Sequence, residues 1–149
     1  MIELRSARIA VLAEPARGLA VDSIVDRASG SQALGAEWHV SVLGETPRGW
    51  TQRGRSESSA AASATLGVLR LDRWIRVGDR EVSLRTTVHN TGVVEFGGAF
   101  VERLRLVPDA ATERGDSGYE GLIGPGRSVT WELTVAFGPV DARSTSSGR

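Results

Sequence analysis

The chain has no cysteine and no lysine, and only two of its 149 residues are histidine. The absence of cysteine excludes disulfides and thiolate metal sites, and it fits a reducing compartment. The two histidines, His39 and His89, lie far apart and have no flanking residues at metal-ligand spacing. We therefore expect neither a metal site nor a cofactor, and we expect a cytoplasmic protein.

The chain also lacks an excess of either charge and any long hydrophobic run. Its 18 acidic residues balance its 18 basic ones, which leaves no electrostatic footprint for nucleic acid or an anionic membrane. No segment approaches the ~20 apolar residues of a membrane span. The first residues, MIELRSARIAVLAEPARG, do not follow the pattern of a signal peptide. These features indicate a soluble domain that binds neither nucleic acid nor membrane.

What the sequence does contain is alternation of apolar and polar residues with a period of two. The clearest cases are 37–43 (EWHVSVL), 81–88 (EVSLRTTV) and 128–137 (SVTWELTVAF). Such alternation is typical of half-buried antiparallel strands. Weaker strands are predicted at 8–13, 19–26, 66–71 and 99–107. Short strands separated by turns predict an all-β fold, a single antiparallel β-sandwich domain with little or no helix.

Other segments lack this alternation. Residues 47–55 (PRGWTQRGR) are predicted to form a loop, and 56–65 (SESSAAASAT) either a thin strand or a mobile loop. The best helix candidate is 108–115, with proline at its start and glycine at its end. Residues 141–149 contain too little apolar material to pack, so we predict a sandwich domain over 1–140 and a disordered tail. Turns are expected at DRASG, GETPRG, RVGDRE, HNTG, RGDSG and GPGR.

Three stretches together show a family pattern. Residues 8–35 (RIAVLAEPARGLAVDSIVDRASGSQALG) read as a strand, a glycine-containing turn and a second strand that runs into another turn. Residues 80–92 (REVSLRTTVHNTG) read as a strand that ends in an asparagine turn, and 121–135 (GLIGPGRSVTWELTV) as a Pro-Gly turn and a closing strand. In these features the chain resembles the galactose mutarotase-like (aldose 1-epimerase) superfamily. The resemblance covers about half of the chain and implies a β-sandwich with a concave sheet that faces a sugar.

The chain departs from that family in the residues of catalysis. Epimerases of the family use a histidine as general acid and a glutamate as general base, and the histidine usually follows the asparagine turn by several residues. Here that region reads VVEFGGAFVERLRLV and contains no histidine, and the family's histidine-glycine motif is also absent. The chain is considerably shorter than a full epimerase. The resemblance therefore implies the fold and sugar binding, and it does not extend to the epimerase chemistry.

Two residues are candidates for catalysis. The ordinary pKa of histidine suits His89 for acid–base chemistry near neutral pH. The alternative is a solvated or turn-bonding residue at the end of a strand. Glu102 falls in an otherwise apolar phase of its strand, where burial would raise the pKa of a carboxyl group and make it an acid or base. Its alternatives are a buried ion pair with an arginine, or a groove-facing carboxylate that binds hydroxyls. No serine has a recognisable base partner.

Candidate ligand-binding residues come from three segments. Trp50 and the arginines around it suit a sugar that stacks on the indole while its hydroxyls accept hydrogen bonds. Alternatively, Trp50 covers the end of the core. In LDRWIRVGDR, Trp74 is most simply a core residue beside solvated arginines. The candidate set is Trp50, Arg48, Arg53, Arg73, Arg76, Tyr119 and Glu120.

Three functions remain open. The first is a non-catalytic carbohydrate-binding module, alone or as an accessory subunit in sugar metabolism. The second is a reduced aldose 1-epimerase that uses His89 or His39 with Glu102 or Glu120. The third is an Ig-like structural or assembly domain without a small-molecule ligand. The expected partners are a sugar or sugar derivative, and a second copy or another protein that covers the sheet edges.

Overall fold

The computed structural model describes the backbone of residues 1–27, 31–42, 45–107 and 115–136, and the side chains of 1–27, 45–100 and 119–136. Within these residues the chain forms strands and one short 3₁₀ helix, and no α-helix. No helix there has the length and apolarity that crossing a membrane requires. The elements are β1 (Ile2–Arg5), β2 (Ile9–Glu14), η1 (Pro15–Arg17), β3 (Ala20–Asp26), β4 (Ser31–Val42), β5 (Arg48–Arg55), β6 (Ser59–Leu66), β7 (Leu69–Val77), β8 (Glu81–Asn90), β9 (Phe96–Val107), β10 (Gly115–Ile123) and β11 (Ser128–Ala136).

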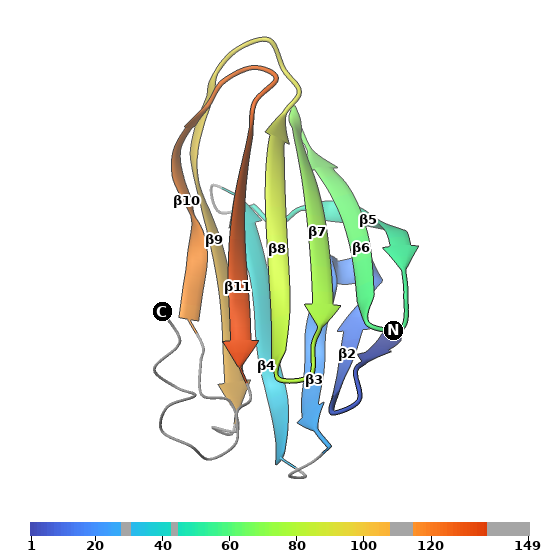
Figure 1. Ribbon diagram of the computed structural model, residues 1–149. Helices are drawn as coiled ribbons and strands as arrows, with labels where there is room; N and C mark the ends of the chain where they lie inside the picture. The colour runs from blue at the N-terminus through green and yellow to red at the C-terminus, as the bar shows by residue number, and fades with distance from the viewer. Residues whose placement is uncertain (28–30, 43–44, 108–114, 137–149) are drawn as a thin grey trace.

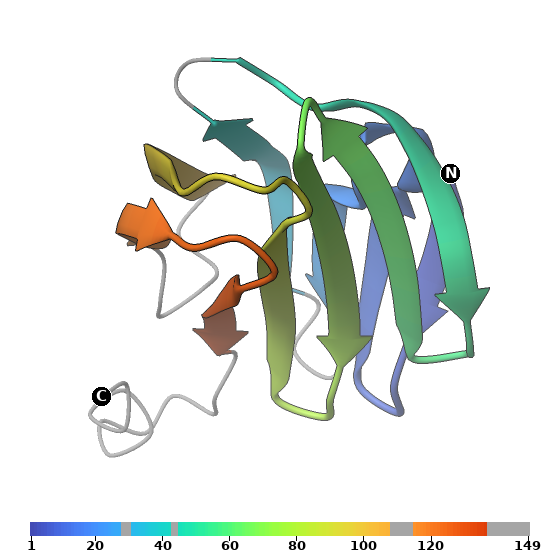
Figure 2. The same ribbon diagram turned by 90° about the horizontal axis from the view of Figure 1, so that it is seen from above.

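The strands form two antiparallel sheets. The six-stranded sheet has the order β1-β2-β3-β4-β9-β10, and the five-stranded sheet has the order β11-β8-β7-β6-β5. Figures 1 and 2 show the two sheets as layers, with β6 to β8 in one and β2 to β4 in the other. The chain crosses between the layers after β4, after β8 and after β10. The predicted all-β antiparallel sandwich is therefore confirmed.

The core lies between the sheets and is built by the predicted alternation. In β8 the even-numbered side chains from Val82 to Asn90 are buried, and in β11 the odd-numbered ones from Trp131 to Val135. Over their described residues, the strands predicted at 37–43, 81–88 and 128–137 lie in β4, β8 and β11. The buried cluster also draws on the six-stranded sheet through Leu4, Ile9, Val11, Ala13, Val21, Ile24 and Phe100.

Several predictions of local structure need correction. Residues 48–55, predicted to be a loop, form β5, whose side chains are mostly exposed because it is an edge strand. Residues 115–118 of the expected RGDSG turn begin β10. Of the two alternatives for 56–65, a strand is correct, since β6 begins at Ser59. The expected helix, apart from Gly115, and the expected tail lie outside the described residues.

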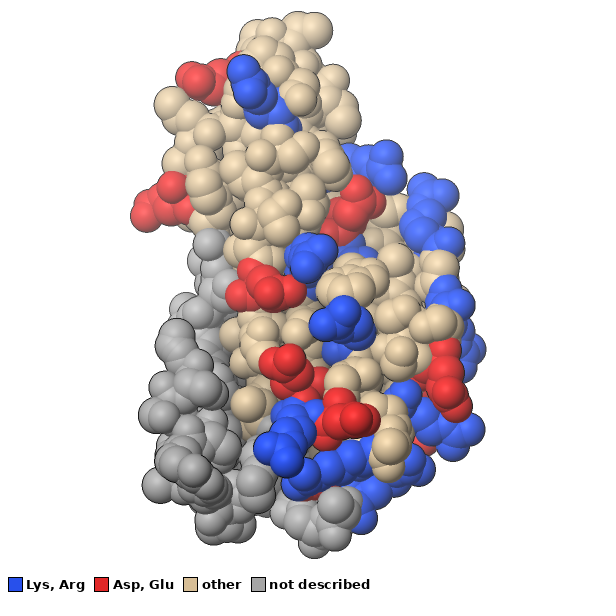
Figure 3. Space-filling view, viewed as in Figure 1, with Lys and Arg blue, Asp and Glu red and all other residues tan. Residues whose placement is uncertain are grey.

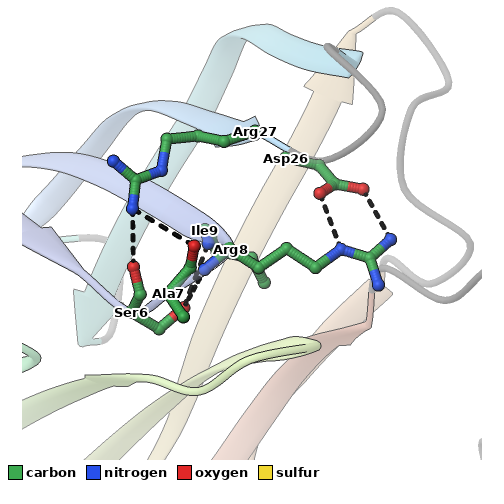
Figure 4. A network of polar contacts seen from close by, with 6 residues as sticks. All are labelled: Ser6, Ala7, Arg8, Ile9, Asp26 and Arg27. Atoms are coloured by element: carbon green, nitrogen blue, oxygen red, sulfur yellow. Dashed lines mark hydrogen bonds and ion pairs between the residues drawn. The ribbon is translucent and has the colours of Figure 1, made fainter.

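A polar network secures the end of the sandwich where β1, β2 and β3 meet (Figure 4). The guanidinium of Arg8 donates two hydrogen bonds to the carboxylate of Asp26, at 2.8 and 2.9 Å. These bonds raise the pKa of Arg8 above its ordinary value. Ser6 Oγ accepts from the backbone N–H groups of Arg8 and Ile9, while Arg27 donates to the backbone oxygens of Ser6 and Ala7. The Arg8–Asp26 pair therefore joins β3 to the turn that precedes β2.

Asn90, in the HNTG segment, connects two of the crossings between the sheets. Its side-chain amide is 1% exposed and donates to the carbonyl oxygens of Val94 and Ile123, both at 2.8 Å. Its Oδ1 accepts from the N–H of Gly92. Its backbone N–H donates to the Arg127 oxygen, and its own carbonyl accepts from Gly126. The connections β8–β9 and β10–β11, which lie together at the top of Figure 1, are thus held by one side chain.

Candidate functional site

The candidate site lies on the outer face of the five-stranded sheet, which is the face turned away from the other sheet. Along β7 the side chains of Leu71, Arg73 and Ile75 are buried, whereas Trp74 and Arg76 point outward. The expectation of a core Trp74 beside a solvated Arg73 is therefore wrong. The register of the sheet determines which face of β7 each residue occupies. Arg73 is on the same face as Leu71 and Ile75, so its side chain points into the interior.

Arg73 is 1% exposed, and its Nη1 donates to Thr86 Oγ1 at 2.5 Å. A guanidinium at this depth is a part of the interior, although Arg73 also contributes to the lining of the hollow described next. Arg76, in contrast, lies on the outer face as a ligand-binding residue would require.

A hollow of about 210 Å³ opens on the outer face, and we call it the β6 hollow. It exists because β6 has small side chains beside the large ones of β7. Ala61 is paired with Trp74 on one side and with Gly54 on the other. A Cβ built on Gly54 would meet nothing within 4 Å, so this edge of the hollow is open. The rest of its lining is formed by Arg53, Ala62, Arg70, Asp72, Arg73, Arg85 and Thr87.

Basic groups outnumber acidic ones around the β6 hollow. Arg53, Arg70, Arg73 and Arg85 line it, against Asp72 alone. Arg53 Nε donates to Ser63 Oγ at 2.6 Å, and Arg70 Nε lies 3.3 Å from Asp72. Across this side of the molecule, blue and red side chains are interspersed (Figure 3). The hollow is thus a locally basic site on a chain with no net charge.

Two arginines are positioned by the indole of Trp74. The guanidinium carbon of Arg85 lies 4.8 Å from the ring centroid, and that of Arg76 lies 5.6 Å from it. Both distances fall in the range of cation–π attraction. Arg85 Nη2 is also 3.5 Å from Glu132. These contacts restrict the long arginine side chains, so less conformational entropy remains to be lost when a ligand binds.

His89 lies on the same outer face, between two polar partners from neighbouring strands. Its Nε2 is 2.8 Å from Asp72 Oδ2, and its Nδ1 is 2.6 Å from Ser128 Oγ. This arrangement fits an imidazole that donates from Nε2 and accepts the Ser128 proton at Nδ1. The side chains of His89 and Asp72 are 36% and 34% exposed. We call these three residues the His89 relay; it shares Asp72 with the β6 hollow.

The prediction that His89 points away from the apolar face is confirmed, but its pairing with Glu102 is not. The backbone of Glu102 belongs to β9, in the other sheet, where it is paired with Val40 and Ser117. The side chain of His89 bonds on the outer face of the five-stranded sheet, so that sheet separates the two residues. The side chains of Glu102 and His39 lie outside the described residues.

Trp50 is turned into the sandwich and does not line the β6 hollow. It packs against both buried clusters, and a Cβ built on Gly18 would lie 2.7 Å from its Cε2. Of the two alternatives for Trp50, these contacts favour the one in which it covers the end of the core. Its neighbour Arg53 does reach the hollow, while Arg48 is exposed at the start of β5.

The last two candidates lie on β10, in the other sheet. Tyr119 packs on the core beside Phe100, with ring centroids 6.2 Å apart, and its hydroxyl donates to the Leu122 oxygen at 3.0 Å. Glu120 is exposed and paired with Ala99. The sequence-predicted residues that the structure brings to one face are therefore Arg53, Arg76 and His89.

Sequence reasoning missed five residues of this face, namely Arg70, Asp72, Trp74, Arg85 and Ser128. The signal for three of them was present, because Arg70, Asp72, Trp74 and Arg76 occupy one phase of a strand whose other phase is largely apolar. The link between Asp72, His89 and Ser128 could not be found in this way. It depends on the register of β7, β8 and β11, which pairs His89 with Arg70 and Ser128.

A second hollow, of about 600 Å³, lies at the end of the sandwich near the network of Figure 4. It is lined by Arg5 and Arg27, by Glu57 and Asp79, and by small residues, without an aromatic ring. Arg5 and Glu57 face each other across 3.6 Å. Because its lining offers no aromatic ring on which a sugar could stack, this hollow is the weaker candidate despite its larger volume.

No known protein-family model and no curated protein sequence matches this chain. Any statement of function must therefore start from the outer face itself.

Proposed function

We propose that the protein is a carbohydrate-binding β-sandwich module, and that it binds sugar in the β6 hollow. The observation that supports this most directly is the position of Trp74, half-buried on an outer face and beside a hollow lined by arginines, Asp72 and Thr87. Sugar sites combine an apolar aromatic surface with a few fixed polar groups. The resemblance to the mutarotase-like superfamily supports the same class of ligand.

The size of the β6 hollow limits the ligand. Pockets for drug-sized molecules measure roughly 300–1,000 Å³, and this one measures about 210 Å³. A single sugar ring, either free or at the end of a chain, suits that volume. Thr87 and Asp72 offer polar oxygens for its hydroxyl groups, and Ala61 leaves room for the ring.

Filling the β6 hollow is expected to weaken binding. In Ala61→Leu the added side chain occupies the space beside Trp74, and we expect affinity for the bound sugar to fall at least ~10-fold, about 1.4 kcal/mol. Binding is measured by titrating ¹⁵N-labelled protein with neutral and acidic monosaccharides while following the indole N–H signals. Trp74→Phe identifies the Trp74 signal. Thr134→Leu is the matched control, because Thr134, in β11, also lies on the outer face of the sheet but does not line the hollow.

The proposal fails if no monosaccharide shifts the Trp74 signal, or if Ala61→Leu binds as well as the unchanged protein. A normal titration of Thr134→Leu shows that an added leucine on this face is not harmful in itself. An assembly function and the expected homodimer remain predictions, which light scattering tests.

A second candidate function, proton transfer to and from a sugar, is favoured by the His89 relay. Asp72 accepts a hydrogen bond from the imidazole and orients it, which is the arrangement that general acid–base catalysis uses. The relay borders the β6 hollow through Asp72, so a bound sugar would lie near it. The reaction would be the opening and closing of the sugar ring, catalysed without the family's usual histidine.

If His89 transfers protons, the protein will accelerate the interconversion of the α and β forms of glucose or galactose. Polarimetry of freshly dissolved sugar measures this rate directly. His89→Ala should return the rate to that of buffer, and Asp72→Asn should lower it by about 10-fold or more. Thr134→Val, which alters the outer face of β11 outside the relay and the hollow, should have no effect. An unaccelerated rate with the unchanged protein would exclude this function and leave the binding proposal intact.

A further inference from the structure

The arginines of the β6 hollow keep hydrogen-bond donors that the fold does not use. Of the five N–H donors of each guanidinium, the fold occupies one on Arg53 through Ser63, one on Arg70 through Asp72 and one on Arg85 through Glu132. Among the described residues, no other hydrogen bond from these three side chains is found. Each therefore keeps unused donors and stands in the lining of the hollow.

The arginines are also held in place before any ligand arrives. Trp74 stacks on Arg85 and Ser63 accepts a hydrogen bond from Arg53 at 2.6 Å, while Arg70 has a weaker, exposed contact with Asp72 at 3.3 Å. A planar guanidinium with two free parallel N–H groups matches the two oxygens of a carboxylate. The hydroxyl groups of a neutral sugar do not require three paired donors of this kind. A neutral ligand would also bring no negative charge to the arginines of the hollow.

The neighbouring acids do not cancel this charge. Asp72 is shared between Arg70 and His89, and the ion pair of Arg85 with Glu132 is long, at 3.5 Å, and exposed. Exposed pairs of this kind are weak, at about 0–1 kcal/mol, so an incoming carboxylate can displace them at little cost.

From these observations we propose that the ligand of the β6 hollow is an acidic sugar, a uronic acid residue. Its carboxylate is bound by Arg85 together with Arg53 or Arg70, and its ring lies beside Trp74 and Ala61. This inference rests on the proposed function, because it names the class of sugar that the same site takes.

The experiment compares D-glucuronate and D-galacturonate with glucose, galactose and acetate, by isothermal titration calorimetry on the full chain. We expect uronates to bind at least ~10-fold more tightly than the neutral sugars, and acetate to bind weakly. Raising the salt concentration from 50 to 500 mM should weaken uronate binding and leave that of neutral sugars nearly unchanged.

Two variants locate the effect. Arg85→Gln and Arg53→Gln should each remove most of the preference for uronates while the affinity for neutral sugars changes little. Arg55→Gln is the matched control on β5, since Arg55 is exposed, donates to the Glu3 oxygen and does not line the hollow. Unfolding by urea confirms that all three variants are folded.

Each outcome has a distinct meaning. Equal affinity for uronates and neutral sugars would overturn the acidic-ligand inference and leave carbohydrate binding in place. Acetate that binds as tightly as uronate would overturn both the acidic-sugar inference and carbohydrate binding, and would indicate a plain carboxylate site. Binding of none of these compounds would overturn both proposals. A uronate preference that survives in Arg85→Gln and Arg53→Gln would also overturn the inference.

Discussion

Asn90→Asp is expected to destabilise the protein by about 4 kcal/mol at pH 7, although the two side chains have nearly the same shape. The amide of Asn90 donates to the carbonyl oxygens of Val94 and Ile123. A carboxylate cannot donate, so two hydrogen bonds of about 1 kcal/mol each would be lost and two acceptors would lose their partner. A charge would also be placed where the side chain is 1% exposed.

The effect should depend on pH with a definite sign. Burial raises the pKa of the introduced aspartate above its unfolded value of about 3.9. The destabilisation is therefore greatest above the folded-state pKa and shrinks as the pH falls toward 4, where the protonated acid donates one hydrogen bond. Urea unfolding at pH 7 and pH 4, each relative to the unchanged protein, measures this difference.

Asn90→Ala separates the charge from the lost bonds, because it removes the same donors but should show no such pH dependence. Thr91→Val is a control at the next residue, since the Thr91 hydroxyl makes an exposed hydrogen bond to the Val68 oxygen. We expect it to cost less than about 1 kcal/mol. A loss below 1 kcal/mol for Asn90→Asp at pH 7 would show that Asn90 does not hold the two crossings together.

The fold could be predicted from the sequence where strands have one buried and one exposed face. β8 and β11 alternate because they lie on the core with one side in solvent, and both were identified almost to their ends. β5 was missed because it is an exposed edge strand with two register shifts, so it has no alternation to recognise. Gly49 and Gly54 made it resemble a loop.

The candidate site could be predicted only in part, because it depends on the pairing of strands. Trp74 was assigned to the core and Arg73 to solvent on the ordinary preference of each residue type. The register of β7 reversed both assignments. His89 was identified, but its partners Asp72 and Ser128 are 17 and 39 residues away in sequence. A serine and an aspartate at such distances become candidates only when three strands are aligned.

The second large effect is expected at Gly18, where Gly18→Ala should destabilise the protein by about 3 kcal/mol. Gly18 has φ +69°, a left-handed conformation that costs other residues about 1 kcal/mol. An added Cβ would also lie 2.7 Å from Trp50 Cε2, so the indole must move. Trp50 packs on both buried clusters, and overpacking of this kind costs about 1–3 kcal/mol. Thermal and urea unfolding measure the loss.

Gly67→Ala isolates the contribution of Trp50. Gly67 has φ +62°, but a Cβ there would meet nothing within 4 Å, so only the backbone cost of about 1 kcal/mol should appear. Because Trp50→Leu removes the ring that clashes, Gly18→Ala should cost less in that background than in the unchanged protein. Equal losses in Gly18→Ala and Gly67→Ala would contradict the close contact. If sugar binding also survives in a folded Trp50→Leu variant, Trp50 serves the core, and the ligand binds on the face that carries Trp74.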